Sequence, residues 1–338
     1  MSNLGGRRAK SSSGRQTKRA VTSDRMAAVI YHPEKADLRR IRTAVDNYLK
    51  PLGWRPTLWL PTDGDSHGAH QAREALAAGA TNILVVGGDG TVRPVVKEVY
   101  QTEVSVGLVP QGTGNVLARN LGIALNQPAK AVARGLLGEV KPIDLGSVTL
   151  RFADGSEHTE VFTGFTGIGL DATIMMRTNA RLKRRIGWVA YVDAGFRSIP
   201  LGWQRLEISV DGAERRRLKV LMLMVGNCGF LPGSITMMPD ARLDDGTLDV
   251  ASVGPRKLWN WIDLFGRVTF LSWFVRPWKL GRRLLDGTAN VKTLDTLNGR
   301  VIEIWPTGTA NIQVDGDPFG QIVYARFEVL PRALKMRL

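Results

Sequence analysis

The chain has 338 residues, 43% of them apolar and 37 of them glycine, which is enough for two domains with a sizeable core. Its 46 basic and 31 acidic residues give a net charge of +15, which favours an anionic partner: a phosphate substrate, an anionic membrane face or nucleic acid. The only cysteine, Cys228, excludes an internal disulfide framework and fits a reducing compartment. No apolar stretch reaches the roughly 20 residues of a transmembrane helix.

The first 25 residues hold seven basic side chains and one acidic one among small polar residues. This composition predicts a disordered basic tail, and the lack of an apolar core argues against a secretory signal peptide. The tail could steer the protein to anionic lipid or simply keep it soluble.

Strands and helices alternate over the next part of the chain, residues 26–143. The pattern predicts a doubly wound α/β domain with an open, parallel sheet. The predicted strands cover residues 26–31, 57–60, 83–86 and 104–109, and the predicted helices cover 38–49, 70–79, 95–100, 116–120 and 129–137.

Two glycine loops follow neighbouring strands of this predicted sheet. The first, Gly87 to Thr91, reads Gly-Gly-Asp-Gly-Thr, and the second, Gly112 to Asn115, reads Gly-Thr-Gly-Asn. Glycine lets a phosphate approach the main chain closely, so two such loops at one sheet edge predict a phosphate-binding rim. A bare Gly-Gly pair alone would be an ordinary turn. Neither loop fits a Walker A or a dinucleotide-binding pattern.

Residues 144–319 have a different sequence pattern: runs in which apolar and polar residues alternate, or in which β-branched residues dominate, are separated by turns such as Asp154-Gly155. They predict a largely antiparallel domain, and residues 320–338 are expected to pack back on the first domain. Residues 256–285 are rich in Trp and Arg, a composition that predicts a helical insert. Three interpretations remain open for it: a helix at the membrane interface, a surface that binds single-stranded nucleic acid, or a buried helical hairpin. The predicted strands are 148–152, 159–165, 206–210, 219–226, 247–253 and 301–305.

The two glycine loops resemble those of the diacylglycerol kinase catalytic-domain family, which includes bacterial lipid kinases and is similar to the sphingosine kinases. The resemblance implies a nucleotide-binding α/β domain, an antiparallel β-sandwich-like domain and an active site in the cleft between them. It implies an ATP-dependent kinase that phosphorylates the hydroxyl of diacylglycerol or a related lipid.

The resemblance also assigns nucleotide contacts. The residues implied are Thr62, Gly87, Gly88, Asp89, Gly90, Thr91, Val92, Arg93, Gly112, Thr113 and Asn115. The sequence departs from the family pattern at Arg93-Pro94, where a small or acidic residue is usual, and at Val116, where an aspartate is common. Arg93 is a candidate phosphate partner, and Pro94 is expected in a first helical turn.

A second signature, residues 239–250, contains Leu-Asp-Asp-Gly and closely matches the lipid kinases. On its own, Asp-Asp-Gly would be a hairpin turn. The resemblance implies Mg²⁺ held by the Asp245 carboxylate and by the carbonyls of Arg242 and Thr247, and coordination by oxygen alone suits this ion.

A third stretch, around Asp315 and Asp317, resembles a segment in which the family has Asp-Gly-Glu. The resemblance makes Asp317 the acceptor of the lipid proton, one methylene shorter than the usual Glu. Asp315 and Asp89 are expected in the Mg²⁺ and water network. If this stretch is a strand, Asp315 and Asp317 share one of its faces; the alternative is a plain hairpin turn.

ATP and a membrane lipid are the partners expected for this kinase, together with an anionic membrane surface and no nucleic acid. We expect a cytoplasmic protein bound peripherally to the inner face of the membrane, and a homodimer is left open. Two alternatives remain: an NAD kinase-like phosphotransferase, or a nucleotide-sensing protein without catalysis that binds membrane or nucleic acid. Salt-sensitive binding without turnover would favour the latter.

Overall fold

The computed structural model describes residues 23–34, 37–169, 203–231, 235–253 and 295–338. Predictions for the basic tail up to residue 22 and for the Trp/Arg-rich insert lie outside these residues. The described strands form one large mixed sheet, parallel in the first part of the chain and mainly antiparallel in the second, plus a two-stranded ribbon.

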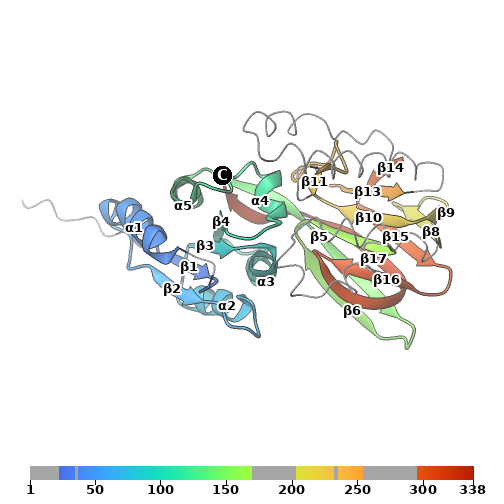
Figure 1. Ribbon diagram of the computed structural model, residues 1–338, viewed down its shortest axis with the longest axis horizontal. Helices are drawn as coiled ribbons and strands as arrows, with labels where there is room; N and C mark the ends of the chain where they lie inside the picture. Colours follow the sequence, from blue (N-terminus) through green and yellow to red (C-terminus); the bar gives the residue numbers. More distant parts are fainter. Residues whose placement is uncertain (1–22, 35–36, 170–202, 232–234, 254–294) are drawn as a thin grey trace, which may run out of the picture.

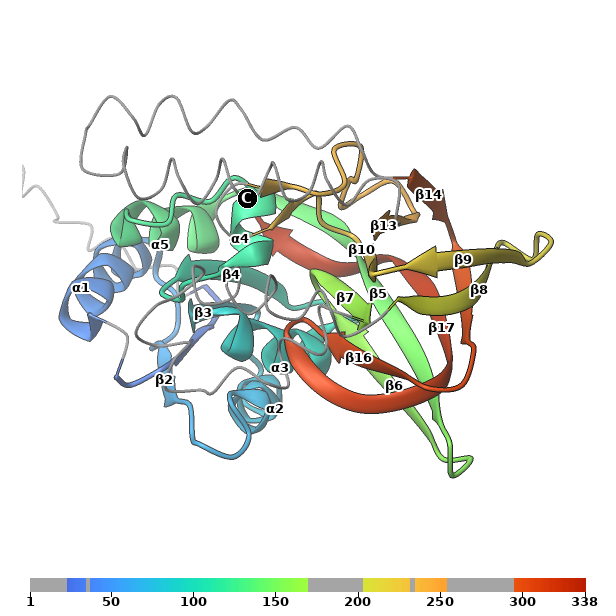
Figure 2. The ribbon, with the colours of Figure 1, turned by 45° about the vertical axis from the view of Figure 1, so that its right-hand side comes forward.

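The first part of the chain forms the predicted parallel sheet, with strand order β4-β3-β1-β2. Buried apolar runs make β1 and β3, as expected of strands covered on both faces. Helices α1 and α5 pack together against one face, and α2 and α3 lie together on the other (Figure 2). The elements are β1 (Ala27–Tyr31), α1 (Leu38–Leu49), a 3₁₀ turn (Lys50–Leu52), β2 (Leu58–Pro61), α2 (Ala69–Ala77), β3 (Asn82–Gly87), α3 (Asp89–Val99), β4 (Ser105–Pro110), α4 (Val116–Asn120) and α5 (Pro128–Leu137).

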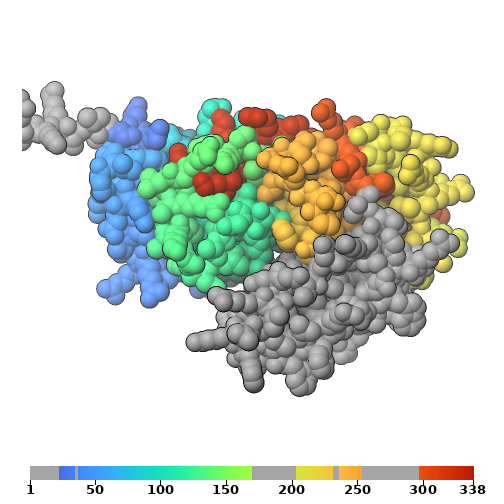
Figure 3. Space-filling model, turned by 90° about the horizontal axis from the view of Figure 1, so that it is seen from above, coloured from blue at the N-terminus to red at the C-terminus, as the bar shows by residue number. Residues whose placement is uncertain are grey.

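Two long strands, β5 (Val140–Phe152) and β17 (Asp317–Arg337), pair antiparallel and connect the two parts (Figure 1). The last residues of β17 pair in parallel with β4, while the rest of β17 pairs with β15 and β16. In Figure 3 the red end of the chain is surrounded by the green segment that carries α5 and β5. The sequence-based boundary at residue 143 therefore falls inside a strand.

The remaining strands form the antiparallel part, where sequence analysis merged two pairs of strands. The run 159–165 divides into β6 and β7 at Thr163-Gly164, and the run 219–226 divides into β9 and β10 at Leu221. The bounds are β6 (Glu157–Phe162), β7 (Phe165–Gly169), β8 (Gln204–Val210), β9 (Arg216–Val220), β10 (Met222–Gly226), β11 (Phe230–Leu231), β12 (Ile235–Thr236), β13 (Leu248–Val253), β14 (Asp295–Gly299), β15 (Val301–Pro306) and β16 (Ala310–Val314).

Each part has its own buried apolar cluster. In the second, the rings of Phe162 and Phe327 meet edge to face with centroids 6.4 Å apart. A Cβ on Gly146 would lie 2.0 Å from the Phe162 ring, so only glycine fits beside this aromatic pair. Burying each ring contributes about 2–3 kcal/mol.

Candidate active site

The two glycine loops meet at the carboxyl edge of the parallel sheet, as the sequence predicts. We call residues Gly87–Thr91 and Gly112–Asn115 the glycine rim. Strands β3 and β4 run side by side up to the pair Gly87 and Pro110, and the Gln111 N–H donates to the Gly87 carbonyl at 2.9 Å. A Cβ on Gly112 would lie 2.6 Å from the Gly88 Cα, so the two backbones touch where any side chain would collide.

Helix α3 starts at Asp89, six residues before the predicted start near Val95. Gly88 is its N-cap residue, and the Gly-Asp-Gly-Thr sequence forms the first helical turn instead of a free loop. The first N–H groups of a helix have no partner within the helix and lie at its positive end, which suits a phosphate. Pro94 consequently lies inside the helix, not in its first turn as expected.

Two side chains of the rim are engaged in holding it together. The Asp89 carboxylate accepts the Val116 N–H at 2.7 Å, which ties α3 to the start of α4. Burial raises the pKa of Asp89, against the lowering effect of its hydrogen bonds. Asn115 has a left-handed backbone, and its amide group bonds both the N–H and the carbonyl of Gly112, at 2.9 and 2.7 Å. Asp89 and Asn115 therefore have a structural part in the rim, and the roles expected of them in the Mg²⁺ network and in nucleotide binding stay predictions.

Other residues predicted to contact the nucleotide lie at the same edge of the sheet. Thr62 follows β2, and its N–H donates to the Tyr31 carbonyl at 2.8 Å. Thr113 is exposed in the second loop. Gly90 has no heavy atom of the described residues within 4 Å of where a Cβ would be, so there is room beside it.

Asp315 and Gly316 form a tight turn between β16 and β17, with φ angles of +47° and +89°. Positive φ at both central residues is the pattern of a type I′ hairpin turn. Asp315 is therefore in a hairpin turn, which is the alternative that the sequence left open, and it does not share a strand face with Asp317. We call Asp315, Gly316 and Asp317 the acidic turn.

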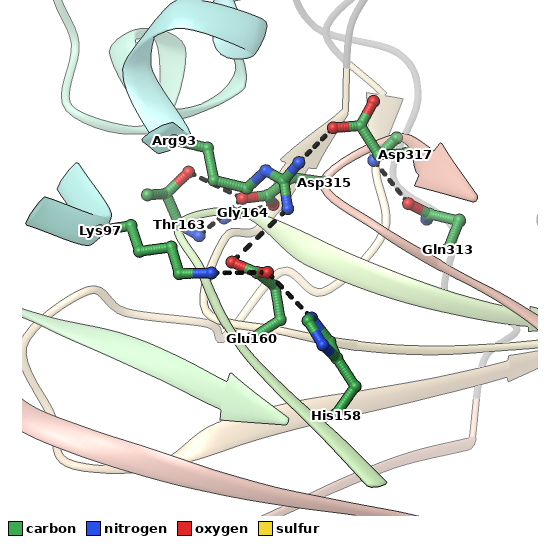
Figure 4. Close-up of polar contacts among 10 residues, drawn as sticks. Arg93, Lys97, His158, Glu160, Thr163, Gly164, Gln313, Asp315 and Asp317 are labelled. Atoms are coloured by element: carbon green, nitrogen blue, oxygen red, sulfur yellow. Dashed lines mark hydrogen bonds and ion pairs between the residues drawn. The ribbon is translucent and has the colours of Figure 1, made fainter. Parts of the chain in front are cut away.

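The carboxylate of the half-buried Asp315 accepts four hydrogen bonds from the junction between β6 and β7, and Figure 4 shows its contacts with Thr163 and Gly164. One oxygen accepts the Gly164 and Phe165 N–H groups at 2.9 and 3.1 Å; the other accepts the N–H and hydroxyl of Thr163 at 2.8 and 3.1 Å. Burial raises the pKa of Asp315, although these bonds and Arg93 oppose the shift. These N–H groups serve Asp315 instead of a strand ladder, which explains the break in the predicted strand.

The acidic turn and the glycine rim are neighbours. A Cβ on Gly164 would lie 3.0 Å from an Asp315 oxygen and 3.1 Å from the Val116 side chain. Val116 in turn donates its N–H to Asp89. The structure thus brings together Asp89 and Asp315, which lie more than 200 residues apart in the sequence.

Asp317 starts β17 with 58% of its side chain exposed and forms an ion pair with Arg93. Arg93 also faces Glu160 of β6, with 3.8 Å between nitrogen and oxygen. Glu160 in turn pairs with Lys97 at 2.9 Å and contacts His158 at 3.2 Å (Figure 4). Burial raises the pKa of Glu160, but Lys97, His158 and Arg93 lower it more, so the net shift is downward.

Sequence reasoning missed Glu160. The available signal was the pair Arg93 and Lys97, which lie four residues apart on one face of a helix and therefore need a common counter-ion.

Asp144, at the predicted domain boundary, was also missed. Its buried carboxylate accepts the Gly246 N–H at 2.7 Å and the Arg332 N–H at 2.6 Å.

The predicted Mg²⁺ residues lie in the loop that Asp144 fixes. Asp245 is exposed, and one of its oxygens accepts the N–H and hydroxyl of Thr247 at 3.1 and 2.9 Å. Nearby Asp249 is buried and has a carboxylate oxygen without a hydrogen-bond partner. Burial and the charges of Asp245 and Asp240 raise its pKa to about 6. This negative potential fits a cation, although no group of three or more His, Cys, Asp or Glu among the described residues forms a metal cluster.

Comparison with known proteins identifies the family of the chain. Residues 26–148 match the family model described as diacylglycerol kinase catalytic domain, and residues 164–278 match the YegS C-terminal NAD kinase beta sandwich-like domain. The chain is 31% identical over 322 residues to a "Probable lipid kinase YegS-like" of Pseudomonas aeruginosa, covering 92% of this chain and 93% of the relative. The chain therefore belongs to the diacylglycerol kinase catalytic-domain family of lipid kinases.

Two further relatives extend the comparison. The "Probable lipid kinase YegS-like" of Pseudomonas putida is 29% identical, covering 93% of this chain and 95% of the relative. A crystal structure titled as a putative diacylglycerol kinase from Bacillus anthracis has 21% identity and a TM-score of 0.71, covering 95% of this chain and 97% of that one. This structure confirms the fold, an α/β domain followed by a β-sandwich-like domain.

The helices of the described part are all too short or too polar to cross a lipid bilayer.

Proposed function

We propose that the protein transfers the γ-phosphoryl group of ATP to the hydroxyl of diacylglycerol or a related lipid, giving a lipid phosphate and ADP. One observation carries the proposal: Gly164 brings the acidic turn against the start of α4, and Asp89 ties that start to the glycine rim. In this proposal the glycine rim binds the phosphates and the carboxylates of the acidic turn lie beside it, an arrangement that suits phosphoryl transfer to an alcohol.

In this mechanism the glycine rim holds the nucleotide. The N–H groups at the start of α3 bind phosphate oxygens, since they carry the positive end of the helix dipole. Thr62 and Thr113 add hydroxyl contacts at the same edge. The backbone contact between Gly88 and Gly112 keeps this surface free of side chains that would block the phosphates.

Asp317 is the group that takes the proton in this proposal. The lipid oxygen bonds to the γ-phosphorus, the bond from that phosphorus to the bridging oxygen breaks, and ADP leaves with the electron pair. The hydroxyl proton passes to the Asp317 carboxylate, whose exposure leaves it accessible to a substrate. Asp315 is occupied by four hydrogen bonds and shapes the turn that presents Asp317.

Mg²⁺ is the cation proposed for the Asp245 loop, held by the Asp245 carboxylate and by the carbonyls of Arg242 and Thr247. The unpartnered oxygen of buried Asp249 adds negative charge beside this site. When bound, a divalent ion neutralises negative charge and fixes a loop of oxygen ligands.

The test is transfer of labelled phosphate from ATP into a panel of lipids in mixed micelles, with NAD as a soluble acceptor. We expect label in diacylglycerol or another hydroxyl lipid. Label in NAD alone would contradict the lipid assignment, and ATP binding without any transfer would favour a sensor of nucleotides.

We further propose that the protein works in the cytoplasm at the inner face of the membrane, since its net charge of +15 favours anionic lipid. Co-sedimentation with vesicles measures this directly. Binding is expected to vesicles that contain phosphatidylglycerol and to weaken as salt rises; equal binding to neutral vesicles would contradict it.

A further inference from the structure

Two positions at which the sequence departs from the family pattern meet in the structure. Arg93 stands where a small or acidic residue is usual, and Asp317 is one methylene shorter than the usual Glu. They lie 224 residues apart in the sequence and form an ion pair (Figure 4). A carboxylate that is 58% exposed has little packing to fix its direction, so the guanidinium of Arg93 is what orients it.

Arg93 is itself held in place by contacts on the side away from Asp317. Its side chain is only 14% exposed, and Glu160, with 7% exposure, faces its other nitrogen. Glu160 cannot swing away, because Lys97 and His158 hold its second oxygen at 2.9 and 3.2 Å. The Phe319 ring lies 6.0 Å from the guanidinium and closes another side.

We propose that Arg93, held by Glu160, is a positioning residue that fixes the Asp317 carboxylate to helix α3, whose first turn forms the glycine rim. This inference rests on the proposed function of Asp317 as proton acceptor. The ion pair sets the place of the carboxylate relative to α3, the helix proposed to hold the nucleotide. It gives Arg93 a task different from the phosphate contact predicted from the sequence.

A thiol introduced by Asp317→Cys reports on this arrangement without any need for activity. A neighbouring cation lowers the pKa of a thiol, and the pH dependence of alkylation by iodoacetamide measures it. The native thiol should not react with iodoacetamide, because Cys228 is buried and burial raises its pKa well above the usual value. Among the residues that the structure describes, the charged or titratable groups around the position are Arg93 and Lys97 of α3, His158 and Glu160 of β6, and Asp315 of the turn.

We expect Arg93→Met to raise the pKa of the introduced thiol by about one unit, since a close opposite charge shifts a titrating group by that much or more. Glu160→Gln is expected to raise it by about half a unit, because Arg93 is no longer held in place. If Glu160 acted only through space, removing its negative charge would lower the thiol pKa instead. The two explanations therefore predict opposite signs.

The matched control is Glu157→Gln, which removes an exposed carboxylate of the same strand that pairs with Arg151. It should leave the thiol pKa unchanged, and urea unfolding of every variant shows that each is folded. No rise with Arg93→Met, or a fall or no change with Glu160→Gln, would overturn the proposal.

Kinetics with native Asp317 separate the two roles of Arg93. A positioning role predicts that Glu160→Gln lowers kcat about tenfold and leaves the KM for ATP within about twofold, while Glu157→Gln changes neither. A rise in the KM for ATP with constant kcat would favour a phosphate contact and overturn the proposal. If the wild type transfers no phosphate to any acceptor, the proposed function fails, and the thiol measurement still decides whether Glu160 and Arg93 hold position 317.

Discussion

The glycine rim and the acidic turn keep their shapes by different means. In the rim, two backbones touch at Gly88 and Gly112, and no charge is needed for that contact. In the acidic turn, Asp315 is anchored by four hydrogen bonds and Asp317 by an ion pair. The rim should therefore be most sensitive to added volume, whereas the turn should be most sensitive to the loss of a carboxylate or of its partner.

The largest effect is expected from adding one methyl group to the rim. In Gly112→Ala the Cβ would lie 2.6 Å from the Gly88 Cα and 2.9 Å from the Asn115 side chain. The two loops must then separate, which costs about 2–3 kcal/mol of unfolding free energy. A comparable loss of binding energy weakens ATP about 100-fold. Urea unfolding and calorimetric titration with ATP measure the two effects.

The control is Gly90→Ala, whose Cβ meets nothing within 4 Å. Because Gly90 lies within α3, alanine should stabilise the fold by about 0.5 kcal/mol. Equal destabilisation by both substitutions would show that the contact between the two loops does not define the rim.

The next effect concerns the anchor of the acidic turn. Asp315→Asn keeps a residue that tolerates the left-handed backbone, but it turns an NH₂ group toward the Thr163 donors. We expect the unfolding free energy to fall by about 2 kcal/mol, since a buried donor then loses its acceptor.

Asp154→Asn is the corresponding control, because Asp154 also caps a turn, through Ser156, but is exposed. Its unfolding midpoint should hardly move. If Asp315→Asn were equally harmless, the four hydrogen bonds would not be what anchors the acidic turn.

Asp249, a buried carboxylate with one oxygen that lacks a hydrogen-bond partner, provides a contrast to Asp315. The pKa of Asp249 is raised to about 6, so the folded state binds a proton more readily than the unfolded chain. Its contribution to stability is therefore lost as pH rises from about 4 to about 6. With chelator present, Asp249→Asn should stabilise the protein by about 2 kcal/mol at pH 7 and have little effect below pH 4. Destabilisation at pH 7 would show that Asp249 has a partner.

The smallest effect should come from Glu160, whose pKa is lowered in the folded state. A lowered pKa contributes stability above the ordinary range of a glutamate, and this stability is lost as pH falls through that range. The stability difference between wild type and Glu160→Gln should therefore shrink on acidification, by less than about 1 kcal/mol. A difference that stays constant from pH 7 to pH 3 would contradict a charged Glu160.

The parallel sheet and the meeting of the glycine loops could be predicted because they depend on local patterns. Buried runs such as 83–86 give strands, and glycines at their ends give close contact. Arg93 and Lys97 indicate that a counter-ion is near, but the sequence could not predict that Glu160 and Asp317 supply the acidic partners, since the antiparallel strand pairings bring residues 93, 160 and 317 together. The start of α3 was placed too late because glycine and proline are poor helix formers, whereas here the helix begins directly at the rim.

The central claim is that the rim holds the nucleotide while the acidic turn supplies the proton acceptor. The most direct test measures kcat with the preferred lipid and the Kd for ATP side by side, in wild type and in Asp317→Asn. We expect a fall in kcat of at least about 100-fold in Asp317→Asn, with the Kd for ATP within about threefold of wild type. Retained kcat would contradict Asp317 as proton acceptor, and a lost ATP affinity would contradict the separation of the two regions.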